Sequence, residues 1–171
     1  PQMVLNFLAG GAAINVLARQ IDARVVIVDM GIAEDIPANE GLIVKKVAYG
    51  TANMTKGPAM TRAQAIESIL NGVQIVEEEI MRGLDIVGTG DMGIGNTTPS
   101  AAIASVLTKR HPKEIAGRGT GLDDKGLLRK ISAIERALDV NKPNMSDGLD
   151  VLAKVGGFEI GGLVGVMLGA A

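Results

Sequence analysis

The chain has 171 residues, 47% of them hydrophobic and 21% charged, and a formal net charge of −2. These values are ordinary for a globular domain and exclude a disordered chain, and the weak, mixed charge gives no electrostatic footprint for nucleic acid. Zero cysteines exclude disulfides and thiol catalysis, and one histidine leaves too few preferred ligands for a zinc site.

No signal peptide opens the chain, and the apolar stretch 160–171 is shorter than the roughly 20 residues that span a bilayer. We therefore expect a cytoplasmic protein that contacts neither membranes nor nucleic acid.

The hydrophobic pattern predicts alternating helices and strands. Residues 4–19 are typical of one apolar helix, and the apolar run at 23–29 is typical of a parallel strand buried on both faces. A mixed, glycine-rich loop region is expected at 31–57, with a short strand at 42–47. A capping box at 61–64 starts the next helix, which ends at Gly83. Its predicted buried face consists of Ile66, Ile69, Leu70, Val73, Val76 and Ile80.

The second half of the chain continues this alternation. Residues 84–88 are predicted as a buried strand, and Thr98 and Pro99 as the N-cap and first residue of a helix at 99–109. A short strand is expected at 114–116, and helices at about 123–139, at 147–155 and from 158 onward. The pattern is typical of a layered α/β fold, Rossmann-like, with a mostly parallel sheet and helices on both faces.

The stretch 90–99 (GDMGIGNTTP) carries the strongest functional signal. A helix start presents unpaired N–H groups, and glycines let a ligand approach the backbone, so the loop can cradle a phosphate or a ribose. Asp91 could accept hydrogen bonds from sugar hydroxyls. The alternatives are an Asx-turn at Asp91, capping of the helix by Asn96 and Thr97, and a purely structural turn.

Two other hypotheses remain open at this point. Residues 88–93 match the G-x-G-x-x-G pattern of dinucleotide-binding folds, which would indicate an NAD(P)-dependent oxidoreductase. Against it, the helix begins about five residues after the third glycine, and Glu114, the acid at suitable spacing, does not end a clear second strand. The third hypothesis is a structural fragment without catalysis.

Three features outside this loop also need a role. The glycine loop 117–121 fits either an anion site or a tight turn, and Lys130 in the following helix is either solvated or functional. Glu159 lies in the otherwise apolar run 155–166. An unpaired buried charge is costly, so this carboxylate must be paired, exposed or functional. We favour a supporting role beneath the loops of the site.

Several blocks, in order, resemble one family. They are residues 6–15 (NFLAGGAAIN), 28–32 (VDMGI), 57–60 (GPAM), 90–99, 119–122 (GTGL), 147–152 (DGLDVL) and 155–159 (VGGFE). Together they resemble the nicotinate-nucleotide–dimethylbenzimidazole phosphoribosyltransferase family, which builds the nucleotide loop of cobalamin. That family usually has Glu at the position of Asp91.

The resemblance implies phosphoribosyl transfer from nicotinate mononucleotide to 5,6-dimethylbenzimidazole, which gives α-ribazole 5′-phosphate and nicotinate. It implies a homodimer and no metal or cofactor. It places the family's general base beyond Ala171, so residues 1–171 would be the central part of a larger enzyme, without a catalytic residue and with little activity alone. The implied substrate-binding residues are Gln2, Met3, Asp91, Met92, Gly93, Gly95, Asn96, Thr97 and Lys130, supported by Gly119, Gly121 and Glu159.

Overall fold

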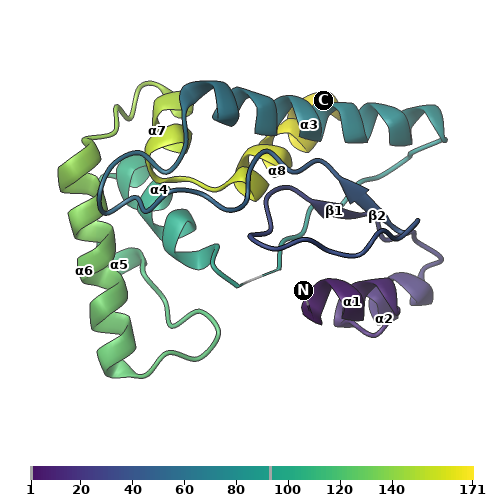
Figure 1. The fold of residues 1–171 in the computed structure, drawn as a ribbon, viewed down its shortest axis with the longest axis horizontal. Helices are drawn as coiled ribbons and strands as arrows, with labels where there is room; N and C mark the ends of the chain where they lie inside the picture. The colour runs from purple at the N-terminus through teal and green to yellow at the C-terminus, as the bar shows by residue number, and fades with distance from the viewer. Residues whose placement is uncertain (1, 93) are drawn as a thin grey trace. The chain divides into compact units, whose positions relative to one another are not determined.

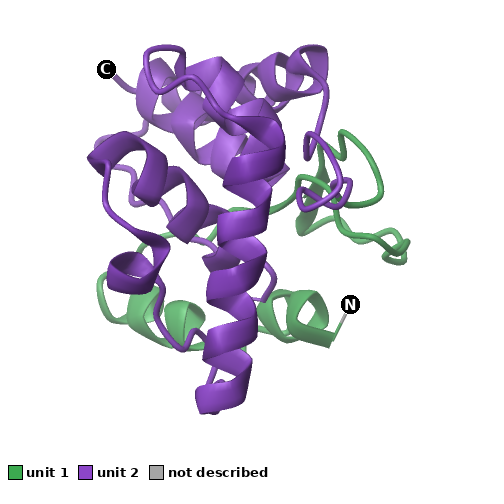
Figure 2. Ribbon diagram, turned by 90° about the vertical axis from the view of Figure 1, so that its left-hand side faces the viewer, with its two compact units in different colours: residues 1–50 green, residues 51–171 purple. Residues whose placement is uncertain are grey.

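The structure is a computed structural model that describes residues 2–92 and 94–171. The chain divides into two compact units, residues 1–50 and 51–171, which Figure 2 shows in green and purple.

The first unit contains two helices and two strands: α1 (Gln2–Leu8), α2 (Ala13–Gln20), β1 (Ile27–Asp29) and β2 (Leu42–Val44) (Figure 1). The strands pair in parallel, with Ile27 opposite Leu42, which confirms the predicted parallel sheet in these residues. The single helix predicted at 4–19 is wrong. Gly10 has φ +73° and follows the end of α1, a conformation that ends helices and that glycine adopts without steric cost.

A buried ion pair organises the end of this sheet. Asp29, the last residue of β1, is 2% exposed, and its Oδ1 accepts the backbone N–H groups of Gly31 (2.9 Å) and Ile32 (2.8 Å). Its Oδ2 lies 2.9 Å from Nζ of Lys46, which follows β2. The carboxyl ends of both strands are therefore held by one side-chain contact.

The described part of the second unit is helical: α3 (Arg62–Met81), α4 (Thr97–Thr108), α5 (Pro112–Ile115), α6 (Asp124–Asn141), α7 (Gly148–Val155) and α8 (Phe158–Gly169). Within the described residues, no helix is both long and apolar enough to cross a membrane. Helices α4, α6 and α7 surround a core whose fully buried members are small or β-branched: Ala101, Ala102, Ile134, Ala137, Val151 and Val155.

Two predicted strands are absent. Residues 84–88 pair with no other described segment, and an apolar run forms a strand only when a second strand lies beside it. The predicted burial of this segment is also wrong, since Ile86 is 87% exposed. The expected strand at 114–116 is largely the end of α5. Pro112 fits its first position, and the His111 side chain accepts the Lys113 N–H at its start. The α/β class is confirmed, with a small parallel sheet and a larger share of helix.

Helices α3 and α8 run in the same direction at very short separation. Gly161 faces Ser68, and Gly165 faces Gly72 and the backbone of Ile69. A Cβ built on Gly165 would overlap the Ile69 carbonyl oxygen and lie 2.9 Å from the Cα of Gly72. Glycine therefore permits this contact.

The predicted burial on α3 is accordingly wrong in part. Ile66, Leu70 and Ile80 are 40%, 59% and 46% exposed, whereas Val76 is buried as predicted. The face of α3 against α8 is formed by Ser68, the Ile69 backbone, Gly72, Val73 and Val76.

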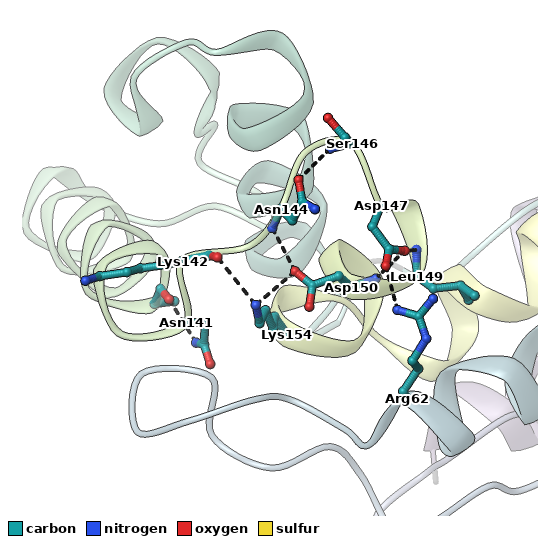
Figure 3. Close-up of polar contacts among 10 residues, drawn as sticks. Arg62, Asn141, Lys142, Asn144, Ser146, Asp147, Leu149, Asp150 and Lys154 are labelled. Carbon is teal, nitrogen blue, oxygen red and sulfur yellow. Dashed lines mark hydrogen bonds and ion pairs between the residues drawn. The ribbon is translucent and has the colours of Figure 1, made fainter.

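A polar network fixes the loop between α6 and α7 (Figure 3). Asp147 caps α7 by accepting two N–H groups of its first turn, and it forms an ion pair with Arg62 at the start of α3 (2.7 Å). The hydrogen bond from Arg62 lowers the pKa of Asp147. Asp150 accepts the Asn144 N–H (2.7 Å) and binds Lys154 Nζ (2.9 Å). The network thus links the start of α7 to α3.

Replacing Gly165 by alanine should separate α3 from α8. Overpacking of a tight core contact typically costs about 1–3 kcal/mol, and we expect Gly165→Ala to lower the free energy of unfolding by the upper part of that range. Urea denaturation measures the change. Gly148→Ala is the matched control, because nothing lies within 4 Å of a Cβ at that position and alanine favours the helix. Equal stability of both variants would contradict the packing described above.

Asp147 should stabilise the chain both as an N-cap and through its charge. Asp147→Ala should cost about 1 kcal/mol, whereas Asp147→Asn keeps a capping oxygen and should cost less. The folded-state pKa of Asp147 is lowered, so its charge contribution is present above the ordinary Asp pKa and is lost as the pH falls through the lowered value. Denaturation at about pH 7 and about pH 2 measures this loss. A difference between wild type and Asn that persists in acid would show that the charge is not its origin.

Candidate functional site

The loop at 88–96 leads into α4, whose start differs from the prediction. Asn96, not Thr98, is the N-cap, and the helix begins at Thr97. Pro99 is consequently the third helical residue. Proline is tolerated there because N–H groups in the first turn have no partner within the helix. These N–H groups form the positively polarised end of a 12-residue helix.

Asp91 is held by the amide of Asn96. Asn96 Nδ2 donates to Asp91 Oδ2 and to the Met92 carbonyl oxygen (3.0 Å). Asn96 is only 8% exposed, and its Oδ1 is buried with no hydrogen-bond partner among the described residues. Desolvation raises the pKa of Asp91, and the hydrogen bonds from Asn96 and from the Met92 N–H oppose this shift. The carboxylate is therefore oriented by hydrogen bonds.

Lys130 reaches the start of α4 from α6. Its Nζ donates to Thr97 Oγ1 (2.9 Å) and to the Gly117 carbonyl oxygen (3.0 Å). Lys130 is 7% exposed, and burial lowers its pKa. Gly119 has φ +57°, and a Cβ at this position would lie 3.0 Å from Thr97 Oγ1. The absence of a side chain at Gly119 therefore gives room to the Thr97 hydroxyl, which accepts the hydrogen bond from Lys130.

These residues line an open cavity of about 360 Å³. The exposed surface of the cavity is mostly apolar, and Ala101, Ala104 and Ile115 line it together with Thr97, Ser100, Gly117, Gly119 and Lys130. The cavity offers a cation, hydroxyl groups and the start of α4, which is the chemistry that binds a phosphate. Ser100 was not predicted as a site residue, although position 100 lies one turn after Thr97. The loop 117–121 was predicted as an anion site or a tight turn, and its Gly117 carbonyl oxygen accepts from Lys130.

The structure brings Thr97, Gly119 and Lys130 together, and Asp91 with Asn96. The other predicted positions lie elsewhere in the loops or outside this unit. Gly95 (φ +89°) and Gly121 (φ +108°) occupy turns that favour glycine, Met92 is exposed, and Gly93 lies outside the described residues. Gln2 and Met3 begin α1 in the first unit.

Glu159 is the second residue of α8 and folds back over the helix start. A Cβ on Gly157 would overlap its Oε1 and lie 2.6 Å from its Oε2. Desolvation is the main cause that raises the pKa of Glu159, and the negative charge of Asp91 raises it further. The sequence predicted a supporting role for Glu159 and gave no sign that Asp91 would be its charged neighbour.

Comparison with known proteins decides the family. A family model described as phosphoribosyltransferase matches residues 1–171. The chain belongs to this phosphoribosyltransferase family. One relative, the nicotinate-nucleotide–dimethylbenzimidazole phosphoribosyltransferase of Desulforudis audaxviator, is 59% identical over 170 residues, which are 99% of this chain and 48% of that protein. The protein of the same name from Chloroflexus aurantiacus is 56% identical over 171 residues, which are 49% of its length.

A solved member of the family has the same fold. The crystal structure of CobT from Thermus thermophilus matches with a TM-score of 0.93 and 43% identity, over 99% of this chain and 50% of that one. The chain thus spans about half the length of the relatives that it matches. These relatives are phosphoribosyltransferases, so the oxidoreductase hypothesis gains no support from them.

Proposed function

We propose that this chain binds nicotinate mononucleotide in an enzyme that transfers its phosphoribosyl group to 5,6-dimethylbenzimidazole. The products are α-ribazole 5′-phosphate and nicotinate. Relatives named for this nucleotide and this base support the proposal. The observation that carries it is the partly buried Lys130 ammonium group at the start of α4, beside Thr97 and Gly117.

The environment of Lys130 suits a phosphate. Both of its hydrogen-bond acceptors are neutral oxygens, and among the described residues no carboxylate lies within ion-pair distance. A buried cation without an anion is costly. A nucleotide phosphate would supply that anion, and the free N–H groups of α4 would bind its other oxygens.

Asp91 suits the ribose. Its carboxylate is oriented by Asn96 and can accept hydrogen bonds from ribose hydroxyls. The azole nitrogen attacks the anomeric carbon opposite the departing base, so the configuration inverts and the ribose gains oxocarbenium character. Such a reaction needs a fixed phosphate, a fixed ribose and a general base. We assign the first two to this chain and no general base to it.

The remaining assignments follow the family resemblance. Gln2 and Met3 would edge the benzimidazole pocket, while Met92, Gly93 and Gly95 would contact the nucleotide through the loop. Gly119 and Gly121 would shape the second loop. A homodimer and a cytoplasmic location also remain predictions.

The activity can be tested directly. With nicotinate mononucleotide and dimethylbenzimidazole, the protein at the full length of its relatives should release nicotinate, which chromatography detects. Residues 1–171 alone should turn over at least 10²–10⁴-fold more slowly, roughly the contribution of a general base. Tight binding of NAD without nicotinate release would contradict the proposal.

Lys130→Ala tests the phosphate contact. Loss of a charge-assisted hydrogen bond should weaken nucleotide binding by about 1.5–3 kcal/mol in calorimetry. Lys125→Ala is the matched control, because Lys125 is exposed on the same helix. Unchanged affinity in the Lys130 variant would refute the phosphate role.

A further inference from the structure

Arg118 lies in the glycine loop 117–121, beside the ammonium group of Lys130. The residue before it, Gly117, accepts a hydrogen bond from Lys130 Nζ through its carbonyl oxygen (3.0 Å). The residue after it, Gly119, is also close, because a Cβ built there would lie 3.8 Å from the same Nζ. Gly117 and Gly119 both line the cavity of about 360 Å³, so the Arg118 backbone runs along the wall of that cavity.

The Arg118 side chain binds the start of α6 and is not among the described residues that line the cavity. Its guanidinium donates to the Leu122 carbonyl oxygen (2.9 Å) and forms an ion pair with Asp124, the first residue of α6. The side chains of Arg118 and Asp124 are 54% and 85% exposed. An ion pair this exposed contributes little to stability, so the guanidinium can leave it at low cost.

The loop leaves Arg118 free to change partner. Nothing lies within 4 Å of a Cβ built on Gly117 or on Gly121, so neither residue packs against the rest of the unit. Consecutive Cα atoms are about 3.8 Å apart, which is less than the length of an extended arginine side chain. Rotation of the Arg118 side chain is therefore enough to bring its guanidinium from Asp124 to the cavity.

A phosphate needs more positive charge than the cavity offers. A phosphate monoester carries about −1.5 to −2 charges at pH 7. Among the described residues that line the cavity, only Lys130 is charged, and the start of α4 adds roughly +0.5. A second cation would complete the neutralisation. Without a phosphate the two cations would repel each other, so the pairing of Arg118 with Asp124 is favoured in the free protein.

We propose that Arg118 is a second phosphate-binding residue, whose guanidinium leaves Asp124 when a nucleotide binds and donates to the phosphate held by Lys130. Two N–H groups of one guanidinium can bind two phosphate oxygens, which adds a fixed orientation that an ammonium group does not provide. This inference rests on the proposed function and adds to its site a residue that changes partner on binding.

Arg118→Gln tests the contact with the phosphate. In the protein at the full length of its relatives, calorimetry should show about tenfold weaker binding of nicotinate mononucleotide, the lower end of what a hydrogen bond to a charged group contributes. Ribose 5-phosphate carries the same phosphate without the base and should lose the same factor. Arg118→Lys keeps the charge without the paired N–H groups and should lose about threefold. Lys125→Gln removes an exposed cation from the start of α6 and is the matched control, with a change of less than about twofold.

Asp124→Asn tests the exchange of partners. It removes the anion that competes for Arg118, so both ligands should bind about twofold to threefold more tightly, which is the scale of an exposed ion pair. The same substitution made in Arg118→Gln should have no effect, because the competition acts only through the guanidinium. This double-mutant cycle separates the exchange from a general effect of the Asp124 charge.

Unchanged affinity for both ligands in Arg118→Gln would overturn the inference. If Asp124→Asn weakens binding as Arg118→Gln does, the ion pair supports the loop and the inference is wrong. A gain from Asp124→Asn that persists in Arg118→Gln would be a general effect of charge and would also overturn it. The proposed function fails separately if wild type binds ribose 5-phosphate but neither binds nicotinate mononucleotide nor releases nicotinate, whereas a wild type that binds neither ligand contradicts both.

Discussion

The contact between α3 and α8 is the constraint on which the second unit depends. Gly72 and Gly165 let the two backbones touch, so the position of α8 along α3 is set by shape and tolerates no added methyl group. Only Gly156 and Gly157 separate α8 from α7, and the α7 core residues pack with those of α4 and α6. The packing among α8, α7, α4 and α6 therefore fixes the positions of the start of α4 and of the Lys130 backbone. The same contact places Glu159 at the start of α8.

The sequence pattern predicted the helices whose formation depends mainly on neighbouring residues. The helices at 62–81, 124–141 and 148–155 have side-chain caps at Thr61, Asp123 and Asp147, and a cap and a period can be recognised from neighbouring residues alone. The segment 84–88 shows the limit of this reasoning. Its composition suits a buried strand, but pairing requires a second strand that the segment itself cannot specify. The buried face of α3 was mistaken for a similar reason: large apolar residues indicate burial in general, whereas the glycines of α8 select small partners.

The contacts of the candidate site are likewise of two kinds, those within one loop and those between segments far apart in the sequence. Asp91 and Asn96 belong to one loop, and their contact could be expected from the motif. Lys130 and Thr97 are 33 residues apart, and their hydrogen bond depends on how α6 packs against α4. Only the family resemblance indicated that both serve one ligand. The place of the Glu159 carboxylate had no local signal beyond an acidic residue in an apolar run, because the room for this carboxylate comes from a glycine two residues earlier.

Charges of opposite sign remain unneutralised within this one unit. Lys130 binds two neutral oxygens, while Asp91 binds an amide and Glu159 lies at a helix start, and none of the three joins a described ion pair. A buried unpaired charge raises the free energy of the folded state. Under the proposed function, a nucleotide phosphate would neutralise Lys130, so part of the binding free energy would come from pairing this cation.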